Sequence, residues 1–82
     1  MKLIGFRKAD FISKDGAPVT GYNVYIATEI DPRRGGGVSV ERDYMSDAKL
    51  SREGLKLEEL LGRECKVYYN RYGKIDSIVV QD

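Results

Sequence analysis

Alternating apolar and polar side chains dominate this sequence and predict a protein built mainly from β-strands. The clearest alternation runs from Val19 to Ile30, where Tyr22, Val24, Ile26, Thr28 and Ile30 share one face. A strand places successive side chains on opposite faces, so we expect the even-numbered face to line the core. Tyr25 then points outward among small and polar neighbours.

The segment before this strand predicts a bent strand and a tight turn. Lys2 to Ser13 alternates imperfectly, and Gly5 lies inside it. Glycine weakens a regular strand, so Gly5 predicts a bulge or a sharp bend. Lys14-Asp15-Gly16 predicts a hairpin turn, because Asp-Gly accepts the backbone angles of such turns.

A glycine-rich loop, Asp31 to Gly37, separates the second strand from the third. It contains a proline, the pair Arg33 and Arg34, and three consecutive glycines, which together predict a mobile hairpin tip. Val38 to Tyr44 then resumes the alternation. We expect its apolar side to face the core, with Arg42 as an exception near the strand end or an edge. That side consists of Val38, Val40 and Tyr44.

The last third of the chain predicts a short helix and a closing hairpin. Helical spacing of Leu57, Leu60 and Leu61 indicates the helix, and Gly62 is suited to end it. The preceding stretch, residues 46–54, is polar and irregular. In the strand that follows, we expect Cys65, Val67 and Tyr69 to face inward and Lys66, Tyr68 and Asn70 to face outward.

The final strand follows a turn at Tyr72-Gly73-Lys74. Its apolar residues change parity between Asp76 and Ile78, which predicts a bulge. The resulting order is three strands, a short helix and two strands. This is the plan of the OB-fold, a small five-stranded Greek-key barrel. We therefore predict a mostly β, OB-fold-like barrel over residues 1–82 as a single domain, with an SH3-like barrel as the alternative.

The composition matches a globular protein of the cytoplasm. A hydrophobic fraction of 41% and a charged fraction of 33% argue against a disordered chain. No apolar run has the length of a membrane span, and no signal-peptide core precedes the first strand. The lone Cys65 cannot form an internal disulfide and suits a reducing compartment. We expect a cytoplasmic location and no membrane contact.

The residue types argue against catalysis. Histidine, the commonest general base and metal ligand, is absent. Cys65 has no histidine to activate it and is expected in the core. Glu41 and Asp43 share a strand face but have no third ligand in view, so a solvated pair is expected. We predict that the protein is not an enzyme and has neither a cofactor nor a metal site.

Nucleic-acid binding is the function that the distribution of charge favours, although the net charge is only +1. OB-folds bind single strands by stacking bases on aromatic rings above a basic groove. Aromatic and basic residues interleave between Lys66 and Lys74. Tyrosine is also a common strand residue, and basic residues also protect sheet edges, so these features have structural explanations as well. The predicted contacts are Tyr25, Arg33, Arg34, Tyr68, Arg71, Tyr72 and Lys74.

The order of these features resembles the single-stranded-DNA-binding proteins of filamentous bacteriophages and related mobile elements. The shared features are the Asp15-Gly16 hairpin, the strand from Tyr22 to Ile30 that leads into a wing at residues 31–37, and the terminal hairpin at residues 67–74. The resemblance implies an OB-fold homodimer that binds single-stranded DNA without sequence specificity during replication or maintenance of such elements. It assigns the wing contacts to Tyr25, Arg33 and Arg34.

Two functions remain as hypotheses. The first is binding of single-stranded nucleic acid, with DNA favoured over RNA. The second is a protein-interaction module, such as a subunit or an inhibitor that uses a barrel face or a strand edge. The balance of 14 basic and 13 acidic residues suits a mixed-charge protein interface as well as a nucleic-acid groove.

Overall fold

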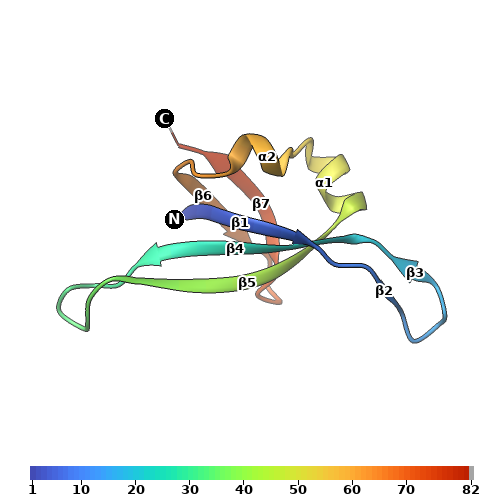
Figure 1. Ribbon diagram of the computed structural model, residues 1–82, viewed down its shortest axis with the longest axis horizontal. Helices are drawn as coiled ribbons and strands as arrows, with labels where there is room; N and C mark the ends of the chain where they lie inside the picture. The colour runs from blue at the N-terminus through green and yellow to red at the C-terminus, as the bar shows by residue number, and fades with distance from the viewer. Residues whose placement is uncertain (82) are drawn as a thin grey trace.

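A computed structural model describes residues 1–81 and shows a mostly β protein with two short helices (Figure 1). One antiparallel sheet has the order β1-β4-β5 and consists of β1 (Lys2–Lys8), β4 (Gly21–Glu29) and β5 (Val38–Ser46). Two hairpins form the other sheets: β2 (Phe11–Ile12) with β3 (Pro18–Val19), and β6 (Cys65–Tyr69) with β7 (Ile75–Val80). Between β5 and β6 lie α1 (Asp47–Glu53) and α2 (Leu57–Leu60).

The predicted mostly β class is confirmed, but the described residues do not form a closed barrel. An isolated bridge between Lys2 and Glu64 and a backbone hydrogen bond of 2.7 Å from Cys65 N to Met1 O connect β1 with the start of β6. No ladder within residues 1–81 joins β5 to β7. The strands therefore form three separate hydrogen-bonded sheets.

The core lies on one side of the β1-β4-β5 sheet. In Figure 1 the β6-β7 hairpin passes behind this sheet, and the two helices lie along its upper edge. Val24 and Ile26 of β4 are buried there, as the alternation predicted. Packing of the hairpin and helices against this face encloses one cluster of apolar side chains. Its buried members are Leu3, Val24, Ile26, Met45, Leu50, Leu57, Leu60, Cys65, Val67, Ile75 and Ile78.

The predicted bulges and turns are confirmed. The register between β1 and β4 shifts between Leu3 and Gly5. In the β6-β7 ladder, Tyr68 pairs with Ser77 whereas Tyr69 pairs with Ile75, so Asp76 is the extra residue. Both predicted turns contain a glycine with positive φ, which only glycine adopts without strain. These are Gly16 at 81° and Gly73 at 76°.

The predicted orientation of β5 is wrong. Tyr22 pairs with Met45 and Val24 with Asp43, and directly paired residues share a face of the sheet. The odd-numbered residues of β5 therefore lie on the core side, where Met45 is fully buried. Val38 and Val40 lie on the opposite side, away from the β6-β7 hairpin, and are exposed.

A second helix forms where the sequence predicted irregular structure. The Ser46 hydroxyl accepts a hydrogen bond of 3.1 Å from Lys49 N and caps the start of α1. Gly54 ends the helix in the left-handed conformation, with φ of 67°. Leu50 is the buried anchor of this helix. The two capping residues and the buried Leu50 stabilise a helix here, although most residues of the segment are polar.

The predicted helix after it is shorter than its leucine pattern suggests. α2 covers Leu57–Leu60, and both of its leucines are buried. Leu61 is exposed and occupies the C-cap position. Gly62 follows it with a positive φ of 79° and ends the helix, as predicted. The N–H of Gly62 bonds to Leu3 O at 2.8 Å and holds the end of α2 against β1.

The junction between β3 and β4 depends on the absence of a side chain at Gly21. A Cβ atom there would lie 2.5 Å from Met45 O and 2.5 Å from the Tyr44 hydroxyl. The same hydroxyl is buried without a hydrogen-bond partner in the described residues. Phe11 contacts the Tyr44 ring edge-on, with 5.4 Å between centroids. The bend into the β2-β3 hairpin is therefore tightly packed.

We expect Gly21→Ala to destabilise the protein by about 2 to 3 kcal/mol, because a backbone carbonyl and a packed ring must move to admit the methyl group. Urea unfolding followed by circular dichroism measures the change. Gly36→Ala is the matched control, since nothing lies within 4 Å of its added Cβ. Equal stability of the two variants would contradict the tight junction.

Candidate nucleic-acid interface

Within residues 1–81, no helix or second sheet covers one face of the β1-β4-β5 sheet, apart from Phe11, which packs on Tyr44 at one end. We call it the open face; it is the side of the sheet turned toward the reader in Figure 1, opposite the β6-β7 hairpin. Its position follows from the register, because the alternate residues of β4 are buried in the core. The pairing places these residues on the open face: Lys2, Arg7, Asn23, Tyr25, Ala27, Glu29, Val38, Val40, Arg42 and Tyr44.

Tyr25 lies near the middle of the open face. Its partner in β1 is Gly5, and a Cβ atom on Gly5 would be 3.7 Å from Tyr25 Cδ2. The tyrosine ring thus lies over the glycine backbone, which leaves the side chain half-buried. The Gly5 backbone thus covers one face of the ring, and the other face is accessible to a ligand.

Two arginines flank this ring. Arg42 is the direct cross-strand partner of Tyr25 in β5. Arg7 pairs with Asn23 and occupies the diagonal position on the β1 side, within reach of a long side chain. Both arginines are exposed, and neither forms an ion pair within residues 1–81. Their guanidinium groups are available to bind phosphates.

The wing, residues 31–37, continues from the same hairpin. Asp31 organises it: its carbonyl accepts from Arg34 N at 2.8 Å, and its Oδ1 accepts from Arg33 N at 3.0 Å. The Arg33 side chain pairs with the Asp31 carboxylate at 3.3 Å but stays 89% exposed. The hydrogen bond from the Arg33 backbone, followed by that from its side chain, lowers the pKa of Asp31. Arg34 forms no ion pair within the described residues.

A second group of predicted residues lies at the end of the β6-β7 hairpin. Asn70 Oδ1 accepts hydrogen bonds from the backbone nitrogens of Tyr72 at 2.9 Å and Lys74 at 3.1 Å, which shapes the turn. Tyr72 is 72% exposed, and the Arg71 guanidinium lies 5.0 Å from its ring centroid. Cation–π pairing of this kind orients both side chains. We call residues 70–74 the hairpin tip.

Tyr68 precedes the tip and points away from the core. Its ring is 45% exposed, and Lys66 Nζ lies 5.3 Å from the ring centroid. The neighbours Cys65 and Val67 are buried, as the alternation of β6 predicted. Tyr68 therefore faces outward on the layer behind the sheet.

The structure brings the predicted residues together in two groups. Tyr25 shares the β4-β5 hairpin with Arg33 and Arg34 of the wing. The other four belong to the β6-β7 hairpin, which packs on the core side of the sheet (Figure 1). The register places Tyr25 on the opposite side. The seven predicted contact residues therefore do not form one continuous binding surface within one chain. The four residues on the β6-β7 hairpin are Tyr68, Arg71, Tyr72 and Lys74.

Arg7 and Arg42 are not among the contacts predicted from the sequence. Arg42 looked like an exception on an apolar strand side, because β5 was assigned the wrong orientation. Met45 is the residue that indicates the correct orientation of β5. It is large, apolar and buried, so the odd-numbered residues of β5 face the core and the even-numbered ones, including Arg42, face the other side. With that parity, Arg42 falls beside Tyr25.

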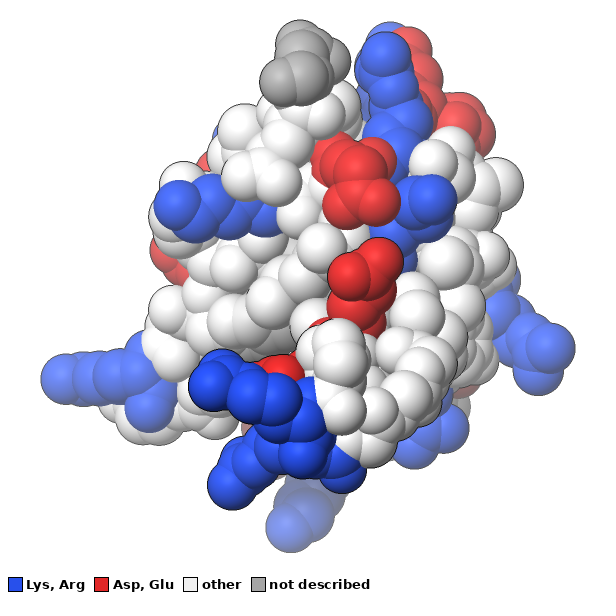
Figure 2. Space-filling view, turned by 90° about the vertical axis from the view of Figure 1, so that its left-hand side faces the viewer, with Lys and Arg blue, Asp and Glu red and all other residues white. Residues whose placement is uncertain are grey.

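Charge on the molecule is mixed. Figure 2 looks onto the end from which the wing projects, with basic side chains extending outward around the lower part of the view and acidic ones between and above them. The net charge of +1 agrees with this distribution. Any attraction of a polyanion must therefore come from local groups such as the wing and open-face arginines.

The acidic residues of β5 lie away from these arginines. Glu41 and Asp43 lie on the core side of the sheet, near the end of β6, and not on an outer face. There Tyr69 is 40% exposed, so the predicted inward position is only partly realised. Burial raises the pKa of Tyr69, and the charges of Asp43 and Glu41 raise it further. The two faces of β5 thus differ in charge.

A scan against protein-family models, a search of curated proteins and a search of solved structures each returned no match. Within residues 1–81, no helix is both long and apolar enough to cross a bilayer.

We expect Asp43→Asn to lower the pKa of Tyr69, because removal of a nearby negative charge favours the tyrosinate. The pKa should stay above the usual value of 10.0, since burial is the largest cause of the shift. Titration of ¹³C-labelled tyrosine by NMR measures it. Because this pKa is raised on folding, the stability that Tyr69 contributes is full below the unfolded value and lost as the pH rises through the folded one.

The control for this titration is Glu58→Gln, which removes a charge from the exposed side of α2. It should leave the Tyr69 pKa unchanged. An unchanged pKa in Asp43→Asn as well would contradict the proximity of the end of β6 to β5.

Proposed function

We propose that the protein binds single-stranded DNA without strict sequence specificity, along the open face and the wing. The observation that carries this proposal is the position of Tyr25 on an uncovered sheet face between Arg7 and Arg42. Proteins that bind single strands combine base stacking on aromatic rings with a positively charged path for the backbone. The open face supplies both.

The length of the β4-β5 hairpin suits a run of several nucleotides. Asp31, at the base of the wing, lies six positions after Tyr25, which corresponds to roughly 20 Å along an extended strand. Ala27 and Val40 form a small apolar surface between them. Bases can stack or rest along this surface while Arg33 and Arg34 contact phosphates beyond it.

We also propose that the fold is an OB-like barrel left open between β5 and β7. Several features support this relationship. The five longer strands occur in the predicted order, and the helices lie between the third and the fourth. The bridge from Lys2 to Glu64 joins the first of these strands to the fourth, as in a Greek-key barrel.

The setting that we propose is replication or maintenance of a phage or mobile element in the cytoplasm. It rests on the resemblance of the sequence layout to filamentous-phage single-stranded-DNA-binding proteins. In this reading the hairpin tip and Tyr68 supply a second surface, which can contact a continuing strand or a second copy of the chain. The same resemblance is the reason why we propose DNA, and not RNA, as the ligand.

A protein partner is the second candidate function, and two features favour it. Ile4, Val38 and Val40 are exposed apolar residues beside the open face, between 47% and 58% accessible. β5 is an edge strand, whose unpaired backbone groups can add a strand from another chain. A homodimer or a different protein could use this edge.

Binding of labelled oligo-dT should weaken as salt rises. Four arginine contacts predict a slope of log affinity against log salt of about −3 for a single strand. These contacts are Arg7, Arg33, Arg34 and Arg42. Fluorescence anisotropy at several salt concentrations measures the slope, and no binding at low salt would rule out the DNA function and favour a protein partner.

Two variants locate the site. Arg42→Ala should make the slope shallower by about 0.7, whereas the matched control Arg52→Ala on α1 should leave it unchanged. Tyr25→Leu should weaken binding by roughly ten-fold through loss of stacking, and Tyr25→Phe should retain it. If Arg42→Ala and Tyr25→Leu both bound oligo-dT with the affinity of the wild type, the DNA site would lie elsewhere on the molecule.

A further inference from the structure

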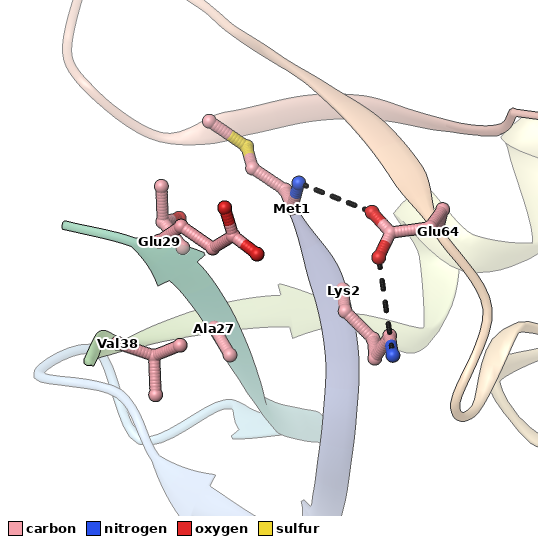
Figure 3. Close-up of a pocket in the computed structure, with 7 residues that line it drawn as sticks. Met1, Lys2, Ala27, Glu29, Val38 and Glu64 are labelled. Carbon is pink, nitrogen blue, oxygen red and sulfur yellow. Dashed lines mark ion pairs between the residues drawn. The ribbon is translucent and has the colours of Figure 1, made fainter. Parts of the chain in front are cut away.

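A cavity of about 390 Å³ lies at the end of the open face nearest the wing (Figure 3). Its walls come from β1, from the β4-β5 hairpin and from the residue before β6. Ala27 and Val38 form apolar walls, and the Glu29 carboxylate points into the space toward Met1 and Glu64. Of its walls, the strand path proposed above includes only Ala27.

The charges around the cavity balance. Glu64 is held between two cations: its Oε2 lies 3.6 Å from the Met1 amino nitrogen and its Oε1 lies 3.8 Å from Lys2 Nζ. Glu29 forms no ion pair within residues 1–81. Two cationic and two anionic groups thus line the space. Its local field neither attracts nor repels a phosphate strongly, but Glu29 offers free hydrogen-bond acceptors.

The cavity adjoins the proposed strand path. Ala27, one of its walls, is two residues from Tyr25 on the same face of β4, a separation of roughly 7 Å. An extended nucleic-acid strand spans such a distance between neighbouring bases. A base next to the one stacked on Tyr25 can therefore reach the cavity without a change of direction.

We infer that this cavity is a subsite for a nucleobase that carries an exocyclic amino group. The inference rests on the proposed function and deepens it. The Glu29 carboxylate accepts hydrogen bonds from an amino group, while Ala27 and Val38 contact the plane of the base. Carboxylates recognise the N4 amino group of cytosine in this way. Thymine and uracil present a carbonyl at the same position, which the carboxylate repels.

The subsite gives a preference in base composition and not a sequence code. One hydrogen-bonding group at one position discriminates between bases only at that position. The remaining contacts, stacking on Tyr25 and ion pairs with phosphates, accept any base. Binding without strict sequence specificity is thus retained.

Labelled oligo-dC and oligo-dU of equal length test this inference, because their bases differ in the amino and carbonyl groups at position 4 and in protonation at N3. The wild-type full chain should bind oligo-dC roughly five- to ten-fold more tightly. Glu29→Gln should abolish that ratio, since its amide can present either an acceptor or a donor. Glu58→Gln, with the same charge change on α2, should keep the ratio.

The ratio of the two affinities separates this inference from the proposed function. Binding of both oligonucleotides with equal affinity, or an unchanged ratio in Glu29→Gln, would overturn the subsite alone. Failure of both to bind would overturn the subsite together with the DNA function. A preference for oligo-dC that disappears only in Glu29→Gln supports the assignment.

Discussion

The pairing register of β4 with β5 is the constraint on which the rest of the structure depends. Tyr22 opposite Met45 places the even-numbered residues of β4 and the odd-numbered residues of β5 on the core side. A shift by one residue would expose Val24 and Ile26 and bury charged groups instead, so the register is strongly specified by burial. The same register sets Tyr25 beside Arg42 on the open face. Core packing and the candidate site are thus two consequences of a single alignment.

The layer arrangement explains why this face is free. The β6-β7 hairpin and both helices pack on the same side of the three-stranded sheet. Backbone hydrogen bonds hold them to the first residues of β1, and the ion pair between Lys8 and Asp47 holds α1 to its last residue. An antiparallel sheet tolerates solvent on one face when the other is covered. The open face can therefore carry an aromatic ring and unpaired arginines without loss of core packing, which is how a domain with a net charge of +1 can present a local site for an anionic strand.

Much of the fold was predictable because its signals are local. The alternation of β4, the bulges at Gly5 and Asp76 and the turn glycines at positions 16 and 73 each follow from a few neighbouring residues. The apolar residues Val38, Val40 and Tyr44 indicate the wrong orientation for β5, since an edge strand can be apolar on its solvent side, and within this strand Met45 indicates the correct one. The same distinction applies to the candidate site: the outward position of Tyr25 follows from the alternation of β4, whereas the position of Arg42 beside it follows only from the register. The separation of the β6-β7 tyrosines from Tyr25 depends on how the layers pack, and no local pattern encodes it.

Chemical-shift mapping of the ¹⁵N-labelled protein with oligo-dT tests the central claim most directly, because it reports every backbone amide at once. We expect the largest changes at Arg7, Tyr25 and Arg42 and along the wing, with smaller changes at the hairpin tip. Changes confined to residues 70–74, or to the core side of β5 around Asp43, would contradict it.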